Sequence, residues 1–177
     1  MIPVKNLLLI LASICFIIVI GGAVYEHIVI VPAWSAAPPA SLSMYQGKYG
    51  INPAPFWMMI HPITLLLLIG SLITNWKNNR KKNILFVLVS YFAVLVITSI
   101  YFVPELLSIT QTPYQDTVDT SLVHRASMWE MLSLVRLAFL VVLAIILLNA
   151  LTKLNAKVIV ESVAEVPLNY ENDAKGG

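Results

Sequence analysis

Four long apolar stretches, separated by polar segments, constrain this chain more than any other feature of its sequence. They cover about residues 7–31, 57–73, 84–103 and 128–151, and each is long enough to cross a hydrocarbon core of ~30 Å as an α-helix. With 59% hydrophobic and 11% charged residues, the chain is too apolar for a soluble domain of average composition. The sequence therefore predicts an all-α integral membrane protein, an antiparallel four-helix bundle.

The distribution of positive charge predicts an orientation for this bundle. We expect one transmembrane domain over residues 1–154 and a disordered cytoplasmic tail over residues 155–177. Basic residues gather on the side of both termini and the middle loop, at Lys5, Lys77, Arg80, Lys81, Lys82, Lys153, Lys157 and Lys175. The positive-inside rule then places both termini in the cytoplasm and the loops 35–55 and 106–126 outside. The net charge of +2 is too small to indicate a nucleic-acid partner.

Two competing classes are disfavoured by the residues near the N-terminus. The first 25 residues partly fit a signal peptide, since Lys5 precedes an apolar run, but that run is longer than a usual signal sequence. The only cysteine is Cys15, in the middle of the first stretch, so the chain has neither an intramolecular disulfide nor a Cys-x-x-Cys pair. This argues against a thiol–disulfide membrane oxidoreductase.

Prolines set the expected ends of the first and third helices. The first is expected from just after Pro3 to about Val31, followed by a loop over residues 32–55. The third is expected to end at Val103, before Pro104. An internal repeat is visible at an offset of 72 residues, pairing Val31-Pro32 with Val103-Pro104, Trp57 with Trp129 and Met59 with Met131. This repeat predicts two similar helical hairpins.

The ionisable residues of all four helices are predicted to meet near the outer rim of the bundle. A rise of ~1.5 Å per residue puts Glu26, His61 and Arg136 at a similar depth, so we expect them to converge in one outward cavity. A charge at membrane depth is costly unless it is paired or functional, and Glu26 is the expected partner of Arg136. Helical spacing places Arg125, Trp129 and Arg136 on one face of the fourth helix.

Several of these residues could also have a purely structural role, with no part in binding or catalysis. The fourth helix begins near Ser121 or at Ser127, and in the second case Glu130 completes a capping box. Glu105, just beyond a proline, fits a solvated charge at the level of the lipid headgroups. His61 fits a hydrogen bond between helices. His27 points ~100° away from its neighbour Glu26, so the two cannot face one point equally.

A metal or a haem is a further interpretation of the same cluster. Imidazole and carboxylate ligands suit iron, copper, manganese or zinc, and two imidazoles suit an axially ligated haem. No Glu-x-x-His or His-x-x-x-His spacing is present, so the pattern selects no metal. The candidate ligands are His27, His61, His124, Glu26, Glu105 and Glu130.

The residues that surround this cluster resemble a known family, the small four-helix membrane proteins grouped with fungal anthrone oxygenases. The resemblance spans about residues 7–151 and is carried by Tyr25-Glu26-His27 with Pro32-Ala33-Trp34, by Trp57 with His61-Pro62, by His124-Arg125, and by Trp129 with Arg136. It implies an oxygen-using enzyme that oxidises a polycyclic phenol or anthrone to a quinone and that requires no metal. Many members of this family have no known function.

Such a reaction needs a base for a ring proton and a group that stabilises the resulting enolate. The predicted catalytic residues are His61, Glu26 and Arg136, with His61 or His27 as the base and Arg136 on the oxyanion. The predicted substrate-binding residues are Trp57, Trp129, His27 and Arg125.

The expected partners are the lipid bilayer and a lipophilic aromatic or quinone-like molecule, with a homo-oligomer or a larger membrane complex left open. The main alternative is a non-enzymatic membrane subunit, or a metal- or haem-binding protein that uses the same His/Glu cluster. A small multidrug transporter is disfavoured because Glu26 lies too far from the membrane midplane.

Overall fold

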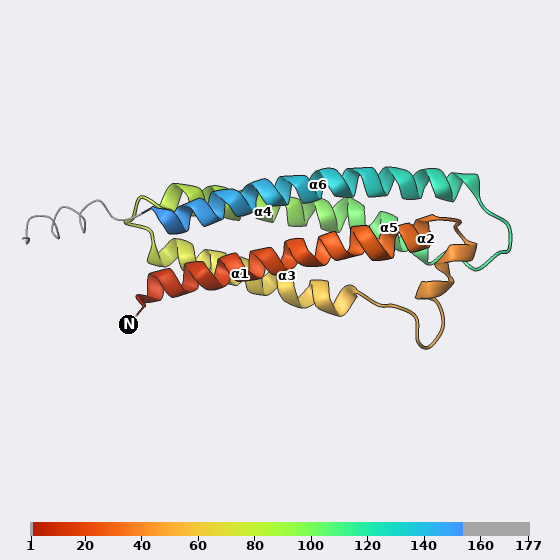
Figure 1. Cartoon of the computed structure of the whole chain (residues 1–177), viewed down its shortest axis with the longest axis horizontal. Helices are drawn as coiled ribbons and strands as arrows, with labels where there is room; N and C mark the ends of the chain where they lie inside the picture. Colours follow the sequence, from red (N-terminus) through yellow and green to blue (C-terminus); the bar gives the residue numbers. More distant parts are fainter. Residues whose placement is uncertain (1, 154–177) are drawn as a thin grey trace, which may run out of the picture.

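The structure, a computed structural model that describes residues 2–153, is an elongated bundle of four helical spans (Figure 1). The spans are Val4–Ser35, Ala54–Thr74, Lys81–Thr110 and Thr120–Thr152, each long and apolar enough to cross a membrane. Their elements in chain order are α1 (Val4–Tyr25), η1 (Glu26–Ile30), α2 (Val31–Ser35), η2 (Ala40–Tyr45), α3 (Ala54–Thr74), α4 (Lys81–Ile97), η3 (Thr98–Phe102), α5 (Val103–Thr110) and α6 (Thr120–Thr152). The predicted fold class, an all-α four-helix membrane bundle, is confirmed. The predicted tail, 155–177, lies outside the described residues.

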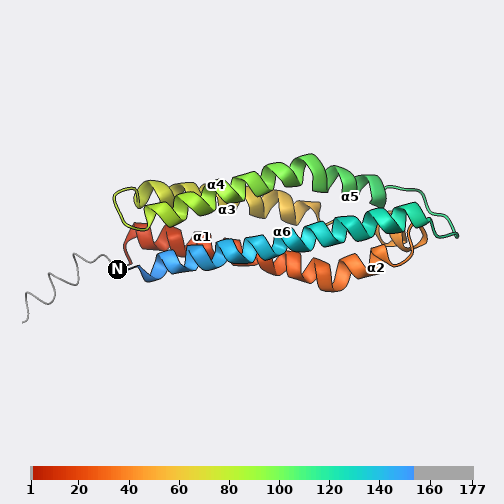
Figure 2. The same ribbon diagram turned by 90° about the horizontal axis from the view of Figure 1, so that it is seen from above.

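The four spans close into a ring in which each helix contacts its two neighbours. α1 packs against α3 and α6, and α4 packs against the same two helices (Figure 2). The N-terminal end of α1 and the C-terminal end of α6 lie at the same end of the bundle (Figure 1). The connection between α3 and α4 lies at that end as well, so consecutive spans are antiparallel.

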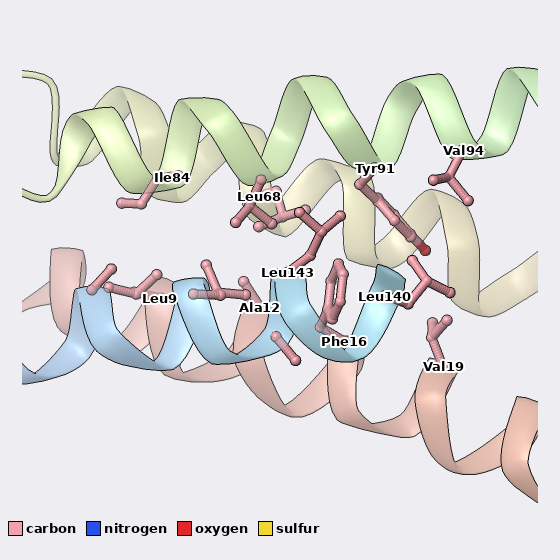
Figure 3. Close-up of a cluster of buried hydrophobic side chains, with 14 of the residues drawn as sticks. Leu9, Ala12, Phe16, Val19, Leu68, Ile84, Tyr91, Val94, Leu140 and Leu143 are labelled. Atoms are coloured by element: carbon pink, nitrogen blue, oxygen red, sulfur yellow. The ribbon is translucent and has the colours of Figure 1, made fainter. Parts of the chain in front are cut away.

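A continuous apolar core holds together the half of the bundle nearer the termini, which we call the lower half; the other half is the upper half. On α1 the buried positions Leu9, Ala12, Phe16 and Val19 follow three- and four-residue steps, which place them on one face of the helix. They meet Leu68, Ile84, Tyr91, Val94, Leu140 and Leu143 from the other three helices (Figure 3). The outward positions of the helices are also apolar, as expected for helices whose solvent is lipid.

The predicted ends of the first and third spans are wrong, because neither Pro32 nor Pro104 stops its helix. Both helices instead widen into one π-helical turn just before the proline, and both then continue as α-helix. Within these turns the Val31 N–H donates to the carbonyl oxygen of Glu26, and the Val103 N–H donates to that of Thr98. These five-residue hydrogen bonds replace the α-helical pattern at the point where a proline ring would clash with the preceding turn.

The two π-helical turns lie 72 residues apart, at the offset of the sequence repeat. Glu26–Ile30 in the first span corresponds to Thr98–Phe102 in the third. Trp57 and Trp129 follow at the same offset, on α3 and α6. The structural correspondence therefore relates the pair of spans α1 and α3 to the pair α4 and α6.

The fourth span begins at Thr120, which confirms the earlier of its two predicted starts. The Asp119 carboxylate caps it, accepting hydrogen bonds from the backbone N–H groups of Ser121 (2.8 Å) and Leu122 (3.3 Å). The predicted capping box at Ser127 and Glu130 is wrong, because both residues lie inside α6.

α3 is much shorter than the other three spans, so the end of the bundle opposite the termini is built differently. A second apolar cluster fills it, formed by Val31, Trp34, Leu42, Phe102, Ile109, Ala126 and Trp129. Leu42 comes from the 3-10 helix η2 in the connection between α2 and α3, which covers the space that α3 leaves open.

Candidate functional site

Glu26 is placed at the boundary between the lower core and the upper cluster. It is the first residue of the π-helical turn η1, and its side chain is half-buried. The indole Nε1–H of Trp57 on α3 donates a hydrogen bond to its Oε1 atom at 2.8 Å. This bond fixes the carboxylate between the first two spans. No hydrogen bond from the described residues reaches the other oxygen, Oε2.

A groove of about 510 Å³ runs beside this carboxylate between α1 and the start of α3. Its lining residues are Ile18, Gly21, Gly22, Tyr25, Glu26, Ile30, Ile51, Pro53, Phe56 and Trp57. Ile18, Tyr25 and Phe56 are also exposed on the outside of the helix pair. The groove therefore opens sideways, and within a membrane span that direction leads to lipid. Glu26 is the only ionisable side chain in an otherwise apolar lining, apart from the phenol of Tyr25.

Two adjacent glycines shape the groove. At Gly22 a Cβ atom would lie 2.7 Å from Cε1 of Phe56 and 3.3 Å from Cη2 of Trp57, so only glycine lets these rings pack against α1. At Gly21 a Cβ atom would meet nothing within 4 Å, because that position faces open space in the groove. Gly22 thus allows the close approach of α3, and Gly21 leaves the groove empty.

His61 lies on the inner side of Trp57. Its Nδ1 atom and the hydroxyl of Tyr91 form a hydrogen bond of 2.7 Å, and its ring stacks on the Trp57 indole with 5.2 Å between centroids. Trp57 therefore touches both Glu26 and His61, while His61 itself does not line the groove. Sequence reasoning missed Tyr91, which is fully buried and whose hydroxyl finds its hydrogen-bond partner in His61.

Arg136 does not form the predicted ion pair with Glu26. Its guanidinium donates hydrogen bonds to Thr98 Oγ1 (3.0 Å) and Ser133 Oγ (2.8 Å), and it lies 4.2 Å from the ring centroid of Phe102. Of the three residues expected to converge in one cavity, only Glu26 lines the groove.

His27 and Trp129 form a separate pair in the upper cluster. Because a carbonyl oxygen only accepts, His27 Nδ1 donates to Ala23 O at 2.8 Å, and the His27 ring stacks nearly parallel to the Trp129 indole with 6.4 Å between centroids. Trp129 Nε1 donates to the carbonyl oxygen of Phe102 at 2.9 Å. Neither residue lines the groove, so Trp57 and Trp129 do not flank one ligand there. The His27 Nε2 atom is buried and has no hydrogen-bond partner among the described residues.

The remaining predicted site residues lie farther toward the end opposite the termini. Arg125 forms an ion pair with Glu105 at 2.8 Å and also donates to Ser108 Oγ at 2.8 Å. His124 is exposed and Glu130 is half-buried. Between residues 2 and 153, no three side chains of the His, Cys, Asp and Glu types come together as metal ligands. The candidate metal ligands are thus spread over the bundle.

Tyr45, at the end of η2, is a second residue that sequence reasoning did not place at the site. Burial and the negative charge of Glu26 raise the pKa of Tyr45 to about 12. The sequence alone gave Tyr45 no role at the site, because the fold of the connection between the first two spans is set by contacts distant in sequence. Its phenol is therefore close enough to Glu26 for the two groups to interact.

The fold and the groove define a small multi-pass integral membrane protein with one carboxylate facing a lipid-accessible apolar groove. The chain matches no family model, and neither a curated protein nor a solved structure is similar enough to be matched.

Proposed function

We propose that the protein is a small membrane oxidoreductase of the oxygenase type, which takes a lipophilic aromatic or quinone-like substrate from the bilayer into the groove beside Glu26. The observation that carries this proposal is a carboxylate held by Trp57 at 2.8 Å in an otherwise apolar groove that opens to lipid. Its volume of about 510 Å³ falls in the range of small-molecule sites. The resemblance to the anthrone oxygenase family supports the same class of substrate.

The proposed reaction converts one anthrone and one O₂ into one anthraquinone and one water. Glu26 accepts a proton from the ring CH₂ group, and the electron pair of that C–H bond spreads onto the carbonyl oxygen as an enolate. The ring carbon then forms a bond to O₂, and the resulting peroxide takes the proton back from Glu26. Loss of the second C–H proton and cleavage of the O–O bond release water and leave the second carbonyl group.

The proposal assigns the base to Glu26 instead of His61, because only Glu26 of the two lines the groove. His61 stacks on Trp57, and Trp57 donates to Glu26, so His61 acts as a positioning residue.

The test is anthrone oxidation by the purified protein in phospholipid nanodiscs, with O₂ uptake and anthraquinone formation measured together. We expect turnover above that of empty nanodiscs, and we expect Glu26→Gln to abolish the excess while the helical content stays the same. The matched control is Glu105→Gln, which removes a carboxylate distant from the groove. Equal rates for Glu26→Gln and the unsubstituted protein would refute the assignment of Glu26 as the base.

A second candidate is a non-enzymatic protein that binds a lipophilic molecule in the same groove. It is favoured by the nearly complete apolar lining, which offers a single strong acceptor and few other polar groups. Saturable binding of anthrone with no anthraquinone formed above the empty-nanodisc rate would select this function.

We also propose that both termini face the cytoplasm and that the groove lies toward the outer side, because of the lysine and arginine bias. Single cysteines at Lys48 and at Asn79, in a Cys15→Ser background, test this orientation in intact cells. Labelling by an impermeant reagent is expected at position 48 only. Labelling at position 79 only would reverse the orientation.

A further inference from the structure

The connection between α3 and α4 lies at the end of the bundle that holds the N-terminus (Figure 1). This connection carries a second hollow. Its volume is about 400 Å³, and its lining residues are Trp76, Lys77, Asn78, Asn79, Lys81 and Lys82. Three of these six residues are lysines and two are asparagines, so the hollow offers mainly hydrogen-bond donors and positive charge. This composition is the opposite of that of the groove at Glu26.

Among the described residues, no carboxylate lies near the positive charge of this hollow. Every acidic residue in the described part of the chain, from Glu26 to Glu130, lies in the half of the bundle away from this end. Two other basic residues at this end, Arg80 and Lys153, have structural partners. Arg80 donates to Asn6 Oδ1 (2.7 Å) and to the carbonyl oxygens of Leu151 and Lys153, and the Lys153 ammonium donates to Asn83 Oδ1. Lys77, Lys81 and Lys82 line the hollow itself, so theirs are the charges that a ligand there would meet.

The surroundings of the hollow match the boundary between headgroups and acyl chains. Trp76 is 55% exposed, and the Lys81 ammonium lies 4.5 Å from its ring centroid. An exposed indole beside lysines is typical of a membrane interface. Directly along the two helices from the hollow, Ile73 on α3 and Phe86 on α4 are exposed apolar side chains. A ligand with a phosphate head and hydrocarbon chains would satisfy both the lysines and these apolar residues.

We propose that this hollow binds the headgroup of an anionic phospholipid of the surrounding bilayer. Lys77, Lys81 and Lys82 neutralise the phosphate, the asparagine amides donate hydrogen bonds, and the acyl chains lie along α3 and α4. A free phosphate would use the same lysines but would leave the apolar side chains without a role. The site is independent of the groove at Glu26, which lies at a different level of the bundle.

The experiment measures the phospholipid retained by the full chain after reconstitution into vesicles of equal phosphatidylglycerol and phosphatidylcholine and gentle extraction into detergent. The unsubstituted protein is expected to retain phosphatidylglycerol in preference to phosphatidylcholine. The triple variant Lys77→Gln, Lys81→Gln, Lys82→Gln is expected to lose this preference, by about fivefold for each lysine removed. Its matched control, Lys5→Gln, Lys48→Gln, Lys153→Gln, removes the same charge outside the hollow and is expected to keep it.

Two further outcomes bear on the source of the ligand. Inorganic phosphate added during extraction is expected to leave the retained phosphatidylglycerol unchanged, whereas its displacement at millimolar phosphate would show a soluble anion site and overturn the proposal. Residues 154–177 contain four acidic residues, Glu161, Glu165, Glu171 and Asp173, and offer another occupant for the hollow. If that segment occupies the hollow, both triple variants retain the same lipid as the unsubstituted protein, and the proposal fails.

Discussion

Replacing each of the two adjacent glycines of α1 by alanine is expected to change stability by different amounts, with Gly22→Ala less stable than Gly21→Ala. Both substitutions gain the same intrinsic benefit, about 0.5–1 kcal/mol for alanine over glycine in a helix. Gly21→Ala adds a methyl group that meets nothing within 4 Å, so it should be stabilising. Gly22→Ala places its Cβ atom 2.7 Å from the Phe56 ring, a distance that forces the ring to move.

The loss of stability expected for Gly22→Ala comes from the aromatic contact that Phe56 loses when its ring moves. Phe56 and Trp57 pack edge to face with 4.8 Å between centroids, an arrangement worth about 0.5–1.5 kcal/mol beyond the area it buries. If the ring cannot move freely, overpacking costs about 1–3 kcal/mol instead. The intrinsic benefit cancels when the two variants are compared, so Gly22→Ala should be less stable than Gly21→Ala by about 0.5–3 kcal/mol.

The assay is reversible unfolding in mixed micelles with increasing dodecyl sulfate, followed by far-ultraviolet circular dichroism. Gly70→Ala is a suitable reference, because its Cβ atom would make only an ordinary contact of 3.7 Å with Leu8. Equal stabilities for Gly21→Ala and Gly22→Ala would refute the close packing of Phe56 and Trp57 on α1, and with it the wall of the groove.

Three further predictions concern the loops and the end opposite the termini. Asp119→Ala should lower the free energy of unfolding by about 1 kcal/mol by removing the α6 cap, and Asp119→Asn should restore it in the same denaturation assay. The folded state holds the Tyr45 proton more tightly than the unfolded state, so stability should be full below pH ~10 and fall as the pH rises toward 12. Tyr45→Phe should make stability less dependent on pH in this range. The control Tyr49→Phe, at an exposed position, should leave the decline in stability unchanged. An unchanged decline in Tyr45→Phe would contradict the prediction. A double-mutant cycle on Glu105 and Arg125, whose side chains are 25% and 36% exposed, should give a coupling below about 1 kcal/mol that weakens with salt, and a coupling insensitive to salt would count against this exposed geometry.

The sequence predicted the number, type and antiparallel order of the spans because apolar length and charge asymmetry report directly on a bilayer. It did not predict that the helices pass through Pro32 and Pro104, because a proline's usual effect is to end or kink a helix. A π-helical turn removes the clash by changing the hydrogen-bond pattern, and nothing in the local residues signals it. The repeated Val-Pro pair was nevertheless a valid marker of the place where both turns form.

The sequence predicted the level of the candidate-site residues along the bundle, but not the direction in which their side chains point. Counting residues along helices predicted a similar level for Glu26, His61 and Arg136. The structure links Glu26 and His61 through the Trp57 indole, and Arg136 bonds elsewhere. Facing was not predictable, because the rotation of each helix about its own axis is set by packing against its neighbours and not by depth. The predicted partner of Arg136 was therefore wrong, and Thr98, in the second π-helical turn, takes that place.

The central claim is that the groove beside Glu26 holds a lipophilic aromatic molecule, and filling the groove tests it most directly. Gly21→Leu projects a side chain into space that is empty within 4 Å of its Cβ atom and leaves the bond between Trp57 and Glu26 in place. The measurement is equilibrium binding of anthrone to the protein in nanodiscs, with Gly70→Ala as the control. Our account predicts saturable binding by the unsubstituted protein and by Gly70→Ala, and its loss in Gly21→Leu. Undiminished saturable binding by Gly21→Leu would contradict the account.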